Sequence, residues 1–301
     1  MHLGNVFSAL LAWLSARSMG GALVLRIEDL DTERCLSAYS RQLAEDLRWL
    51  GLDWDEGYGV GGPDGPYEQS KRTALYDAAL HRLEEQGLVY PCYCSRAERL
   101  AASAPHRSDG QTAYDGKCRA LTAGERAELE AKGRRPACRL AVPDRVFGFT
   151  DGNMGYFEEN LAYGCGDFLV RRTDEVYGYQ LAVVVDDAAM GVTQVVRGGD
   201  LLDSTPRQLW LYELLGLKAP KFFHVPLLIA ADGHRLSKRE RDLDIGVLRE
   251  RFSPEELVGR LAFLAGLQAA PEPIAAGELV SAFDWAKVSK EDIVLNEEWL
   301  T

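Results

Sequence analysis

Two short segments contain side chains suited to phosphate chemistry. His2-Leu3-Gly4-Asn5 stands directly before a helical pattern, and a helix N-terminus offers free N–H groups and partial positive charge to an anion. Glycine permits close backbone approach, while His and Asn side chains can donate hydrogen bonds to phosphate oxygens. Far downstream, the basic segment Arg235-Leu236-Ser237-Lys238-Arg239 could stabilise charge on a leaving pyrophosphate. Taken singly, each segment is more often an ordinary helix start or a solvated turn.

A third group of residues has the composition of a metal site. Cys92-Tyr93-Cys94 is followed by Tyr114 and Cys118, and tetrahedral zinc favours thiolates from closely spaced cysteines. A Cys-x-Cys pair with one further cysteine is an incomplete zinc pattern, so spacing alone favours buried or incidental reduced cysteines. The other cysteines are interpreted as small buried residues: Cys35, Cys138 and Cys165.

Candidate ligand-binding side chains also stand beside predicted strands. Glu28 follows a strand predicted over residues 22–27, at the carboxyl end, where open α/β sheets bind ligands. Arg197 ends a strand predicted near residues 193–196, and its guanidinium suits a carboxylate better than an ammonium would. Tyr179 begins a β-branched run, residues 179–187, predicted as another strand. The plain alternatives are a surface acid, an exposed arginine and a core aromatic.

The elements that must position these residues alternate between strand and helix. Helices are predicted at residues 6–17, 37–50, 71–86 and 205–215, and shorter ones at 243–252 and 254–267. This alternation predicts an α/β fold with a parallel sheet. Residues 92–164 are less regular and hold most of the cysteines.

Length and composition exclude several classes of protein. The chain has 301 residues, 47% hydrophobic and 27% charged, which indicates a globular protein rather than a disordered or fibrous one. A net charge of −12 argues against a general nucleic-acid coat, although a selective RNA enzyme could keep a local basic face. The cysteines are too few for a secreted disulfide scaffold, and no apolar run is long enough to span a bilayer. No basic region precedes the first apolar stretch, so a cytoplasmic protein without membrane contact is expected.

The two phosphate-binding segments together resemble the HIGH and KMSKS signatures of class I aminoacyl-tRNA synthetases. Three further blocks resemble the glutamyl branch of that class: RIEDLD at 26–31, YQLAVVVDDA at 179–188 and GVTQVVRG at 191–198. All of these blocks lie in the family's order. Only about 60 residues follow Lys238, too few for the large anticodon-binding region of a full glutamyl-tRNA synthetase. The chain therefore resembles the glutamyl-queuosine tRNA(Asp) synthetases, and so does the continuation into Asp242-Leu243-Asp244-Ile245-Gly246.

The resemblance implies a domain organisation. The expected fold is the class I synthetase fold: a Rossmann-like nucleotide-binding parallel sheet with an inserted zinc-containing subdomain and a short C-terminal helical segment. Residues 1–87 and 165–240 would form the two halves of the catalytic domain, residues 88–164 the insertion, and residues 241–301 the helical segment. No anticodon-binding domain is expected.

The resemblance also implies an activity. Enzymes of this family activate L-glutamate with ATP and attach it to the cyclopentene-diol of queuosine in the anticodon of tRNA(Asp). By resemblance, Glu28 would bind the ammonium of glutamate, while Tyr179 and Arg197 would line its pocket. The expected partners are ATP with Mg²⁺, glutamate and this tRNA, and a monomer is expected. By the same resemblance, the catalytic and ATP-binding residues are His2, Gly4, Asn5, Ser237 and Lys238.

The last two expectations concern a metal site and an RNA-binding surface. The resemblance completes one structural Zn²⁺ site, with Cys92, Cys94, Tyr114 and Cys118 as ligands. Because a phenolate is an unusual zinc ligand, His106 is an alternative to Tyr114. Three basic pairs are candidates for an RNA-facing patch, or else plain surface charge: Arg134-Arg135, Arg171-Arg172 and Lys218 with Lys221.

One departure from the family pattern lies at the start of the chain. The family has a strand and loop of the form R-F-A-P-S-P-[ST]-G before the His-Leu-Gly element, whereas this sequence has Met1 there. That segment would supply a central strand and an arginine for the glutamate carboxylate. Its loss would leave unpaired backbone groups and a hole in the core. We expect Met1 to be an internal methionine of a longer reading frame.

Three rival functions remain. The first is a shortened glutamyl-tRNA synthetase that charges the acceptor end of its tRNA. The second is another nucleotidyltransferase on the same fold, which amino-acid-dependent pyrophosphate exchange would distinguish. The third is a non-enzymatic RNA-binding relic, which the absent strand suggests.

Overall fold

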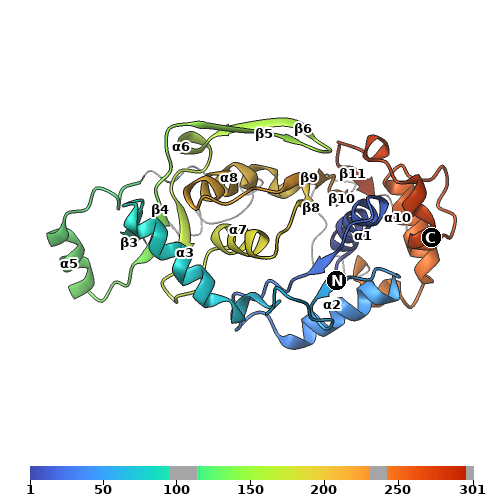
Figure 1. The fold of residues 1–301 in the computed structure, drawn as a ribbon, viewed down its shortest axis with the longest axis horizontal. Coiled ribbons are helices and arrows are strands. Elements are labelled where there is room, and N and C mark those ends of the chain that lie inside the picture. The colour runs from blue at the N-terminus through green and yellow to red at the C-terminus, as the bar shows by residue number, and fades with distance from the viewer. Residues whose placement is uncertain (95–113, 115, 231–232, 234–242, 296–301) are drawn as a thin grey trace.

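The computed structural model describes residues 1–94, 114, 116–230, 233 and 243–295. The molecule is elongated, and its elements form three groups along the long axis (Figure 1). Parallel strand pairs and their helices make up the centre, an antiparallel sheet lies at one end, and C-terminal helices lie at the other. Within the described residues, no helix is both long and apolar enough to cross a bilayer.

The central group contains short parallel strands. Strand β1 (Val24–Leu25) pairs with β2 (Glu56–Gly57), and β8 (Gln194–Gly198) pairs with β9 (Lys221–Val225). The accompanying helices are α1 (Leu3–Ser18), α2 (Ser37–Trp49), α3 (Thr73–Glu85), α7 (Tyr179–Ala189) and α8 (Thr205–Leu214), with the 3-10 helices η1 (Gln69–Lys71) and η3 (Gly199–Ser204).

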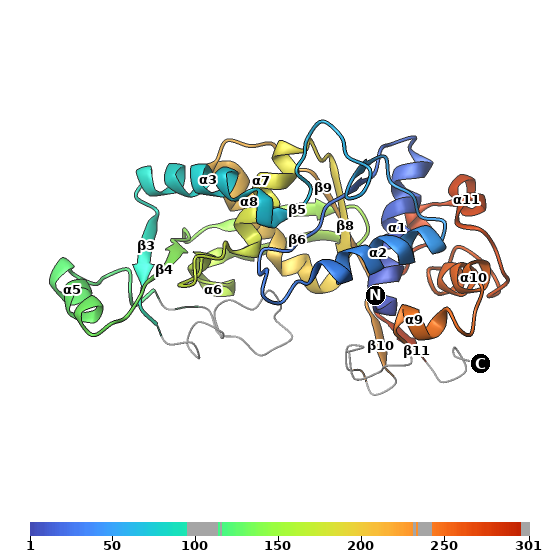
Figure 2. The ribbon, with the colours of Figure 1, turned by 90° about the horizontal axis from the view of Figure 1, so that it is seen from below.

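The antiparallel end is built around a three-stranded sheet (Figure 2). Strand β4 (Ala137–Leu140) pairs with β3 (Val89–Cys92) on one side and with β7 (Phe168–Arg171) on the other. Helix α5 (Ala123–Ala131) begins at a capping box formed by Thr122 and Glu125. The hairpin of β5 (Val146–Asp151) and β6 (Gly155–Asn160) precedes the short helix α6 (Leu161–Gly164), and β5 contacts both α8 and β9.

The C-terminal group packs on the first helix. Strand β10 (Leu228–Ala230) pairs in parallel with β11 (Ile293–Leu295). Between them lie α9 (Ile245–Leu248), α10 (Pro254–Leu264), α11 (Ala276–Leu279), η5 (Val280–Ala282) and η6 (Trp285–Lys287). Burial of apolar side chains from α1 and α10, including Leu10 and Leu261, joins this group to the centre. A second core joins α3, α7 and α8 through Tyr76, Leu181 and Leu211.

The expected α/β content with parallel strand pairs is confirmed, but one predicted strand is wrong. Residues 179–187 form helix α7, and every residue from Gln180 to Asp187 is buried. Three consecutive valines have a high strand propensity, and in this segment burial against neighbouring elements overrides that propensity. The strand predicted at residues 22–27 is reduced to β1, and the helix predicted at 243–252 is reduced to α9.

A cavity of about 650 Å³ separates the two parallel pairs. Its walls include residues 22–26, which contain β1, and residues 192–197, which contain most of β8. Among the described strands, β1 pairs only with β2 and β8 only with β9. The two strands therefore each present an edge without a strand partner in the described part of the chain.

Candidate active site

The first predicted phosphate-binding residues lie at the start of α1. His2 is the N-cap, and its carbonyl accepts hydrogen bonds from the backbone N–H groups of Asn5 (2.9 Å) and Val6 (3.2 Å). A Cβ atom placed on Gly4 would meet no atom within 4 Å, so there is open space beside the backbone of the first turn. This arrangement has the exposed N–H groups and the room that an anion needs at a helix N-terminus.

The chain returns to this helix start just after the predicted basic segment. Asp244 pairs with His2 in an antiparallel bridge, and the N–H of Ile245 donates to the carbonyl of Met1 at 2.8 Å. Ser237 and Lys238 themselves lie outside the described residues. The structure places Asp244 and Ile245, which follow that segment in the sequence, beside the N-terminus of α1, although about 240 residues separate them from it along the chain.

The three residues predicted to bind glutamate line the same cavity. Glu28, Tyr179 and Arg197 all border the cavity between β1 and β8. Glu28 follows β1, Tyr179 is the first residue of α7, and Arg197 lies in β8. Burial raises the pKa of Tyr179 to about 12, and the nearby charge of Glu28 contributes to the rise, so the phenol remains a hydrogen-bond donor at neutral pH.

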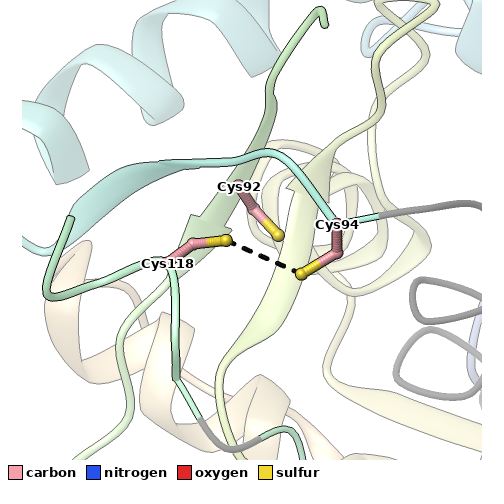
Figure 3. Close-up of side chains that lie close together, drawn as sticks. All are labelled: Cys92, Cys94 and Cys118. Atoms are coloured by element: carbon pink, nitrogen blue, oxygen red, sulfur yellow. Dashed lines mark hydrogen bonds between the residues drawn. The ribbon is translucent and has the colours of Figure 1, made fainter. Parts of the chain in front are cut away.

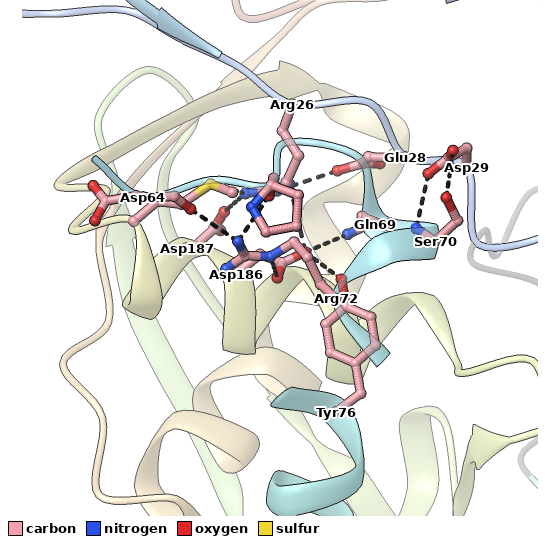
Figure 4. A network of polar contacts seen from close by, with 12 residues as sticks. Arg26, Glu28, Asp29, Asp64, Gln69, Ser70, Arg72, Tyr76, Asp186 and Asp187 are labelled. Carbon is pink, nitrogen blue, oxygen red and sulfur yellow. Dashed lines mark hydrogen bonds and ion pairs between the residues drawn. The ribbon is translucent and has the colours of Figure 1, made fainter. Parts of the chain in front are cut away.

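A buried charge network supports this cavity (Figure 4). Arg26 donates to Asp187 at 2.8 Å and to Glu28 at 3.2 Å, which ties the end of β1 to α7. Burial raises the pKa of the Asp187 carboxyl, although the charge of Arg26 opposes the rise. Arg26 and Asp187 lie inside blocks that the sequence analysis used only for family resemblance, and their roles at the cavity were not predicted.

Beneath Arg26, the neighbouring Asp186 carboxylate is fully buried and has three donors. It accepts hydrogen bonds from Arg72 (2.6 Å), Gln69 (2.8 Å) and Tyr76 (2.7 Å). These donors come from η1, α3 and the residue between them, so the carboxylate fixes α7 to that segment. A buried carboxylate with this many donors stabilises the fold only while all of its partners stay in place.

Arg197 is held by a second buried group that the sequence analysis missed. Its Nε donates to Nε2 of His224 at 3.0 Å, and its Nη2 donates to the hydroxyl of Thr205 at 2.8 Å. His224 lies in β9 and was not singled out, because a lone histidine in an apolar strand has no distinctive spacing.

The predicted metal ligands do come together at the antiparallel end of the molecule. The sulfur atoms of Cys92, Cys94 and Cys118 all lie within 4.8 Å of one another, with Cys94 and Cys118 at 3.6 Å (Figure 3). The hydroxyl of Tyr114 lies 3.2 Å from the Cys94 sulfur and 3.6 Å from the Cys92 sulfur. Three soft thiol donors and one phenol oxygen can surround a tetrahedral metal ion. His106, the alternative fourth ligand, lies outside the described residues.

Arg139 completes the surroundings of this cluster. Its side chain is fully buried, its Nε donates to the Cys92 sulfur at 3.2 Å, and its guanidinium carbon lies 3.7 Å from the ring centre of Tyr114. Burial raises the pKa of the Cys94 thiol to about 12. By contrast, hydrogen bonds from the Cys94 backbone and from Arg139 lower the pKa of the Cys92 thiol against the effect of burial. A bound cation would favour the thiolate forms further.

The proposed RNA-facing arginines are partly occupied by acidic neighbours. Arg172 forms ion pairs with Asp31 (2.9 Å) and Asp174, and Arg171 pairs with Glu175 at 3.5 Å. Lys218 and Lys221 are exposed. Exposed lysines remain available for phosphate contacts more readily than paired arginines do.

Short parallel strands flanked by helices, with a charged cavity between the strand pairs, define an α/β protein. The chain belongs to the family of class I tRNA synthetases (E and Q), catalytic domain, whose profile matches residues 1–301.

Individual relatives refine the comparison. The chain is 53% identical to a glutamyl-Q tRNA(Asp) synthetase of Symbiobacterium thermophilum, over 99% of this chain and 93% of the relative. It is also 53% identical to a protein of the same name from Nitratidesulfovibrio vulgaris, over 89% of this chain and 83% of the relative. A solved glutamate-tRNA synthetase from Elizabethkingia anophelis has a TM-score of 0.83 and 28% identity, and this chain spans 66% of its length.

Proposed function

We propose that this protein activates L-glutamate with ATP and transfers it to queuosine in tRNA(Asp). The observation that carries the proposal is the 53% identity to a glutamyl-Q tRNA(Asp) synthetase over nearly the full length of both chains. The cavity supports it, because Glu28, Tyr179 and Arg197 together offer an anion, a phenol donor and a guanidinium. An amino acid with two carboxylates and an ammonium needs such a mixed set of partners.

In the proposed first step, a carboxylate oxygen of glutamate attacks the α-phosphate of ATP in line. A mixed anhydride forms as the bond to pyrophosphate breaks. The N-terminus of α1, with His2, Gly4 and Asn5, would hold the phosphates, and Lys238 with Ser237 would neutralise the leaving charge. Mg²⁺ would accompany ATP on its phosphates. In the second step, a diol hydroxyl of queuosine attacks the anhydride and AMP leaves.

The metal site belongs to the proposal in a structural role. Cys92, Cys94, Tyr114 and Cys118 would hold one Zn²⁺, which supplies folding free energy to a segment with a very small apolar core of its own. We propose the boundaries 1–87, 88–164, 165–240 and 241–301 for the catalytic halves, the insertion and the helical segment. Strand β4 of the insertion pairs with β7, which follows the boundary at residue 164.

The proposal is tested with two measurements on the purified protein. Glutamate-dependent exchange of pyrophosphate into ATP tests the first step. Transfer of labelled glutamate to tRNA(Asp) that contains queuosine, against the same tRNA with guanosine at that position, tests the second. If pyrophosphate exchange occurs but glutamate is transferred equally to the two tRNAs, the proposed acceptor is contradicted. Charging of tRNA(Glu) instead would favour the rival suggested by the solved glutamate-tRNA synthetase.

Lys238 provides a sharper test of the first step. Replacing it with alanine should lower glutamate-dependent exchange by a factor on the order of 10², as loss of one donor to developing charge typically does. ATP binding, measured by calorimetry, should change much less. The matched control is Lys132→Ala, which removes an exposed lysine at the C-cap of α5. An unchanged exchange rate in Lys238→Ala would remove this residue from the mechanism.

A further inference from the structure

Behind Arg197 lies a linear set of buried polar groups from three different elements. Nε of Arg197 in β8 lies 3.0 Å from Nε2 of His224 in β9. Nδ1 of His224 lies 2.6 Å from Oδ2 of Asp151, the last residue of β5. His224 is fully buried and Asp151 is 2% exposed, so no solvent stands between these groups.

The chemistry of arginine determines which proton His224 carries. A guanidinium is always charged in proteins and has only donors, so an atom that bonds to its Nε must be an acceptor. Nε2 of His224 therefore carries no proton, and the proton of the neutral ring lies on Nδ1. That N–H donates to Asp151, which fixes the tautomer. Burial, together with the charge of Arg197, lowers the pKa of His224 in spite of Asp151, which agrees with a neutral ring.

These bonds determine how the guanidinium is presented to the cavity. His224 takes up Nε of Arg197, and Thr205 takes up one hydrogen of Nη2. In the described part of the chain, Nη1 makes no hydrogen bond, and Arg197 lines the cavity. Nη2 also points toward the carbonyl of Leu201 at 3.5 Å, so Nη1 is the nitrogen left for a ligand, at an angle that β5, β9 and α8 define together.

We propose that His224 and Asp151 are positioning residues that aim Arg197 at a carboxylate of the substrate, with the tautomer of His224 as the determinant. The inference rests on the proposed function, because glutamate is the carboxylate in question. Neither residue touches the reacting atoms. Each acts through Arg197, and Asp151 does so from a hairpin outside the parallel strand pairs.

Asp151→Asn tests the tautomer with almost no change in shape. Oδ1 of Asp151 accepts from the backbone N–H groups of Asn153 (3.0 Å), Met154 (2.8 Å) and His224 (3.1 Å), and an asparagine oxygen can keep all three bonds. Its amide nitrogen would replace Oδ2 and would donate to Nδ1. The ring must then carry its proton on Nε2, where it faces the Nε–H of Arg197, donor against donor.

The expected result is a selective loss of glutamate binding. In pyrophosphate exchange, the KM for glutamate should rise on the order of 10-fold or more, as small misplacements of a substrate-binding group do. The KM for ATP should stay within about twofold. Asp144→Asn is the matched control, because Asp144 precedes the same hairpin and, among the described residues, its side chain bonds only to Asn160 and Tyr163. An unchanged KM for glutamate in Asp151→Asn, with the melting temperature retained, would overturn the proposal.

Two further measurements cover the case in which Asp151→Asn does not fold. His224→Gln keeps an acceptor oxygen for Arg197, while His224→Leu removes it, so the KM for glutamate should rise clearly less in the glutamine variant. Equal KM values in the two variants would contradict the proposal. ¹⁵N NMR of histidine in the wild type should show a protonated Nδ1 and a bare Nε2 for His224. A protonated Nε2 would also overturn it. Because this spectrum needs no activity, a failure of the proposed function is distinguishable from a failure of this inference.

Discussion

Arg139 is the one cation in direct contact with the sulfur cluster among the described residues. The three thiolates of a tetrahedral Cys₃Tyr site would carry one more negative charge than a divalent ion neutralises, and a buried excess charge is costly. Arg139 lies where it can compensate, with Nε on the Cys92 sulfur and its plane over the ring of Tyr114. It also donates to the backbone oxygen of Asp167, so its position is fixed from both ends.

We expect about one zinc per chain and a dependence of its retention on Arg139. Arg139→Met should release zinc to a chromophoric chelator at least about tenfold faster than the wild type, because an uncompensated anionic site binds its metal less firmly. Arg134→Met is the control, since within the described part of the chain Arg134 donates to the backbone carbonyl of Tyr93 and to none of the cysteine sulfurs. Metal-free protein after careful reduced preparation would refute the site, and equal release rates in both variants would refute the role of Arg139.

His224 predicts a pH dependence of stability with a definite sign. Its pKa in the folded protein is lowered from the ordinary value of 6.5, chiefly by burial. Below pH 6.5, His224 binds a proton in the unfolded chain but stays neutral in the folded chain. The free energy of unfolding therefore falls as the pH drops from 6.5 toward the pKa of the folded state. The slope contributed by one such group is at most about 1.4 kcal/mol per pH unit.

The measurement is chemical denaturation of the wild type and His224→Gln between about pH 7.5 and pH 5. The advantage of the wild type should shrink as the pH falls, because glutamine has no proton to bind. A difference that stays constant across this range would mean that His224 is not buried in the neutral form. The other histidines are present in both proteins, so their contributions cancel in the difference between the two.

At the scale of elements, α7 is a helix because of its tertiary packing, although its sequence pattern predicts a strand. Its valines favour a strand by propensity, yet the segment is a helix because it is enclosed by α3, α8 and β7. The helices α2 and α3, which are amphipathic, and the largely apolar α1 were all predicted to within a few residues. The missed helix is the one whose central residues are three consecutive valines.

Asp186 gives this central helix its polar attachment, and its removal should be strongly destabilising. Asp186→Asn leaves the buried guanidinium of Arg72 without its charged partner. Breaking such a pair from one side costs about 3–5 kcal/mol of unfolding free energy. Urea denaturation measures the loss, with Glu85→Gln at the exposed end of α3 as a control that should change little. A loss below about 1 kcal/mol would mean that the network is not essential to packing.

Some residues of the candidate site could be predicted from the sequence, and others could not. Glu28, Tyr179 and Arg197 came from blocks with a family resemblance, and they do line one cavity. His224 and Asp151 could not be found this way, because their relation exists only after β5 folds against β9. A contact between residues 73 positions apart has no local pattern in the chain. The grouping of the three cysteines was predicted from the family resemblance, because their spacing alone is an incomplete metal-binding pattern.

At the scale of the whole molecule, the lining of the cavity between β1 and β8 combines charged residues with apolar ones. The lining includes the charged residues of the proposed glutamate site, the edges of two strands, and small or apolar residues such as Ala12, Ala16 and Val183. Unpaired strand edges and an apolar hollow together destabilise a folded chain. A strand laid between β1 and β8 would satisfy both edges at once and would fill the apolar part of the hollow.

We therefore expect a variant extended before Met1 by a segment of the family form R-F-A-P-S-P-[ST]-G to be more stable than the chain of residues 1–301. The gain should raise the melting temperature by several degrees, on the order of 2–4 °C for each kcal/mol at this chain length. It should also protect the backbone amides of β1 and β8 from hydrogen exchange, because they would then lie in a continuous sheet. An extension with the same residues in scrambled order is the control, since it adds equal length and charge without the pattern. Equal melting temperatures and equal exchange in the two extended chains would show that the hollow does not accept a strand, and that β1 and β8 are stable as separate pairs.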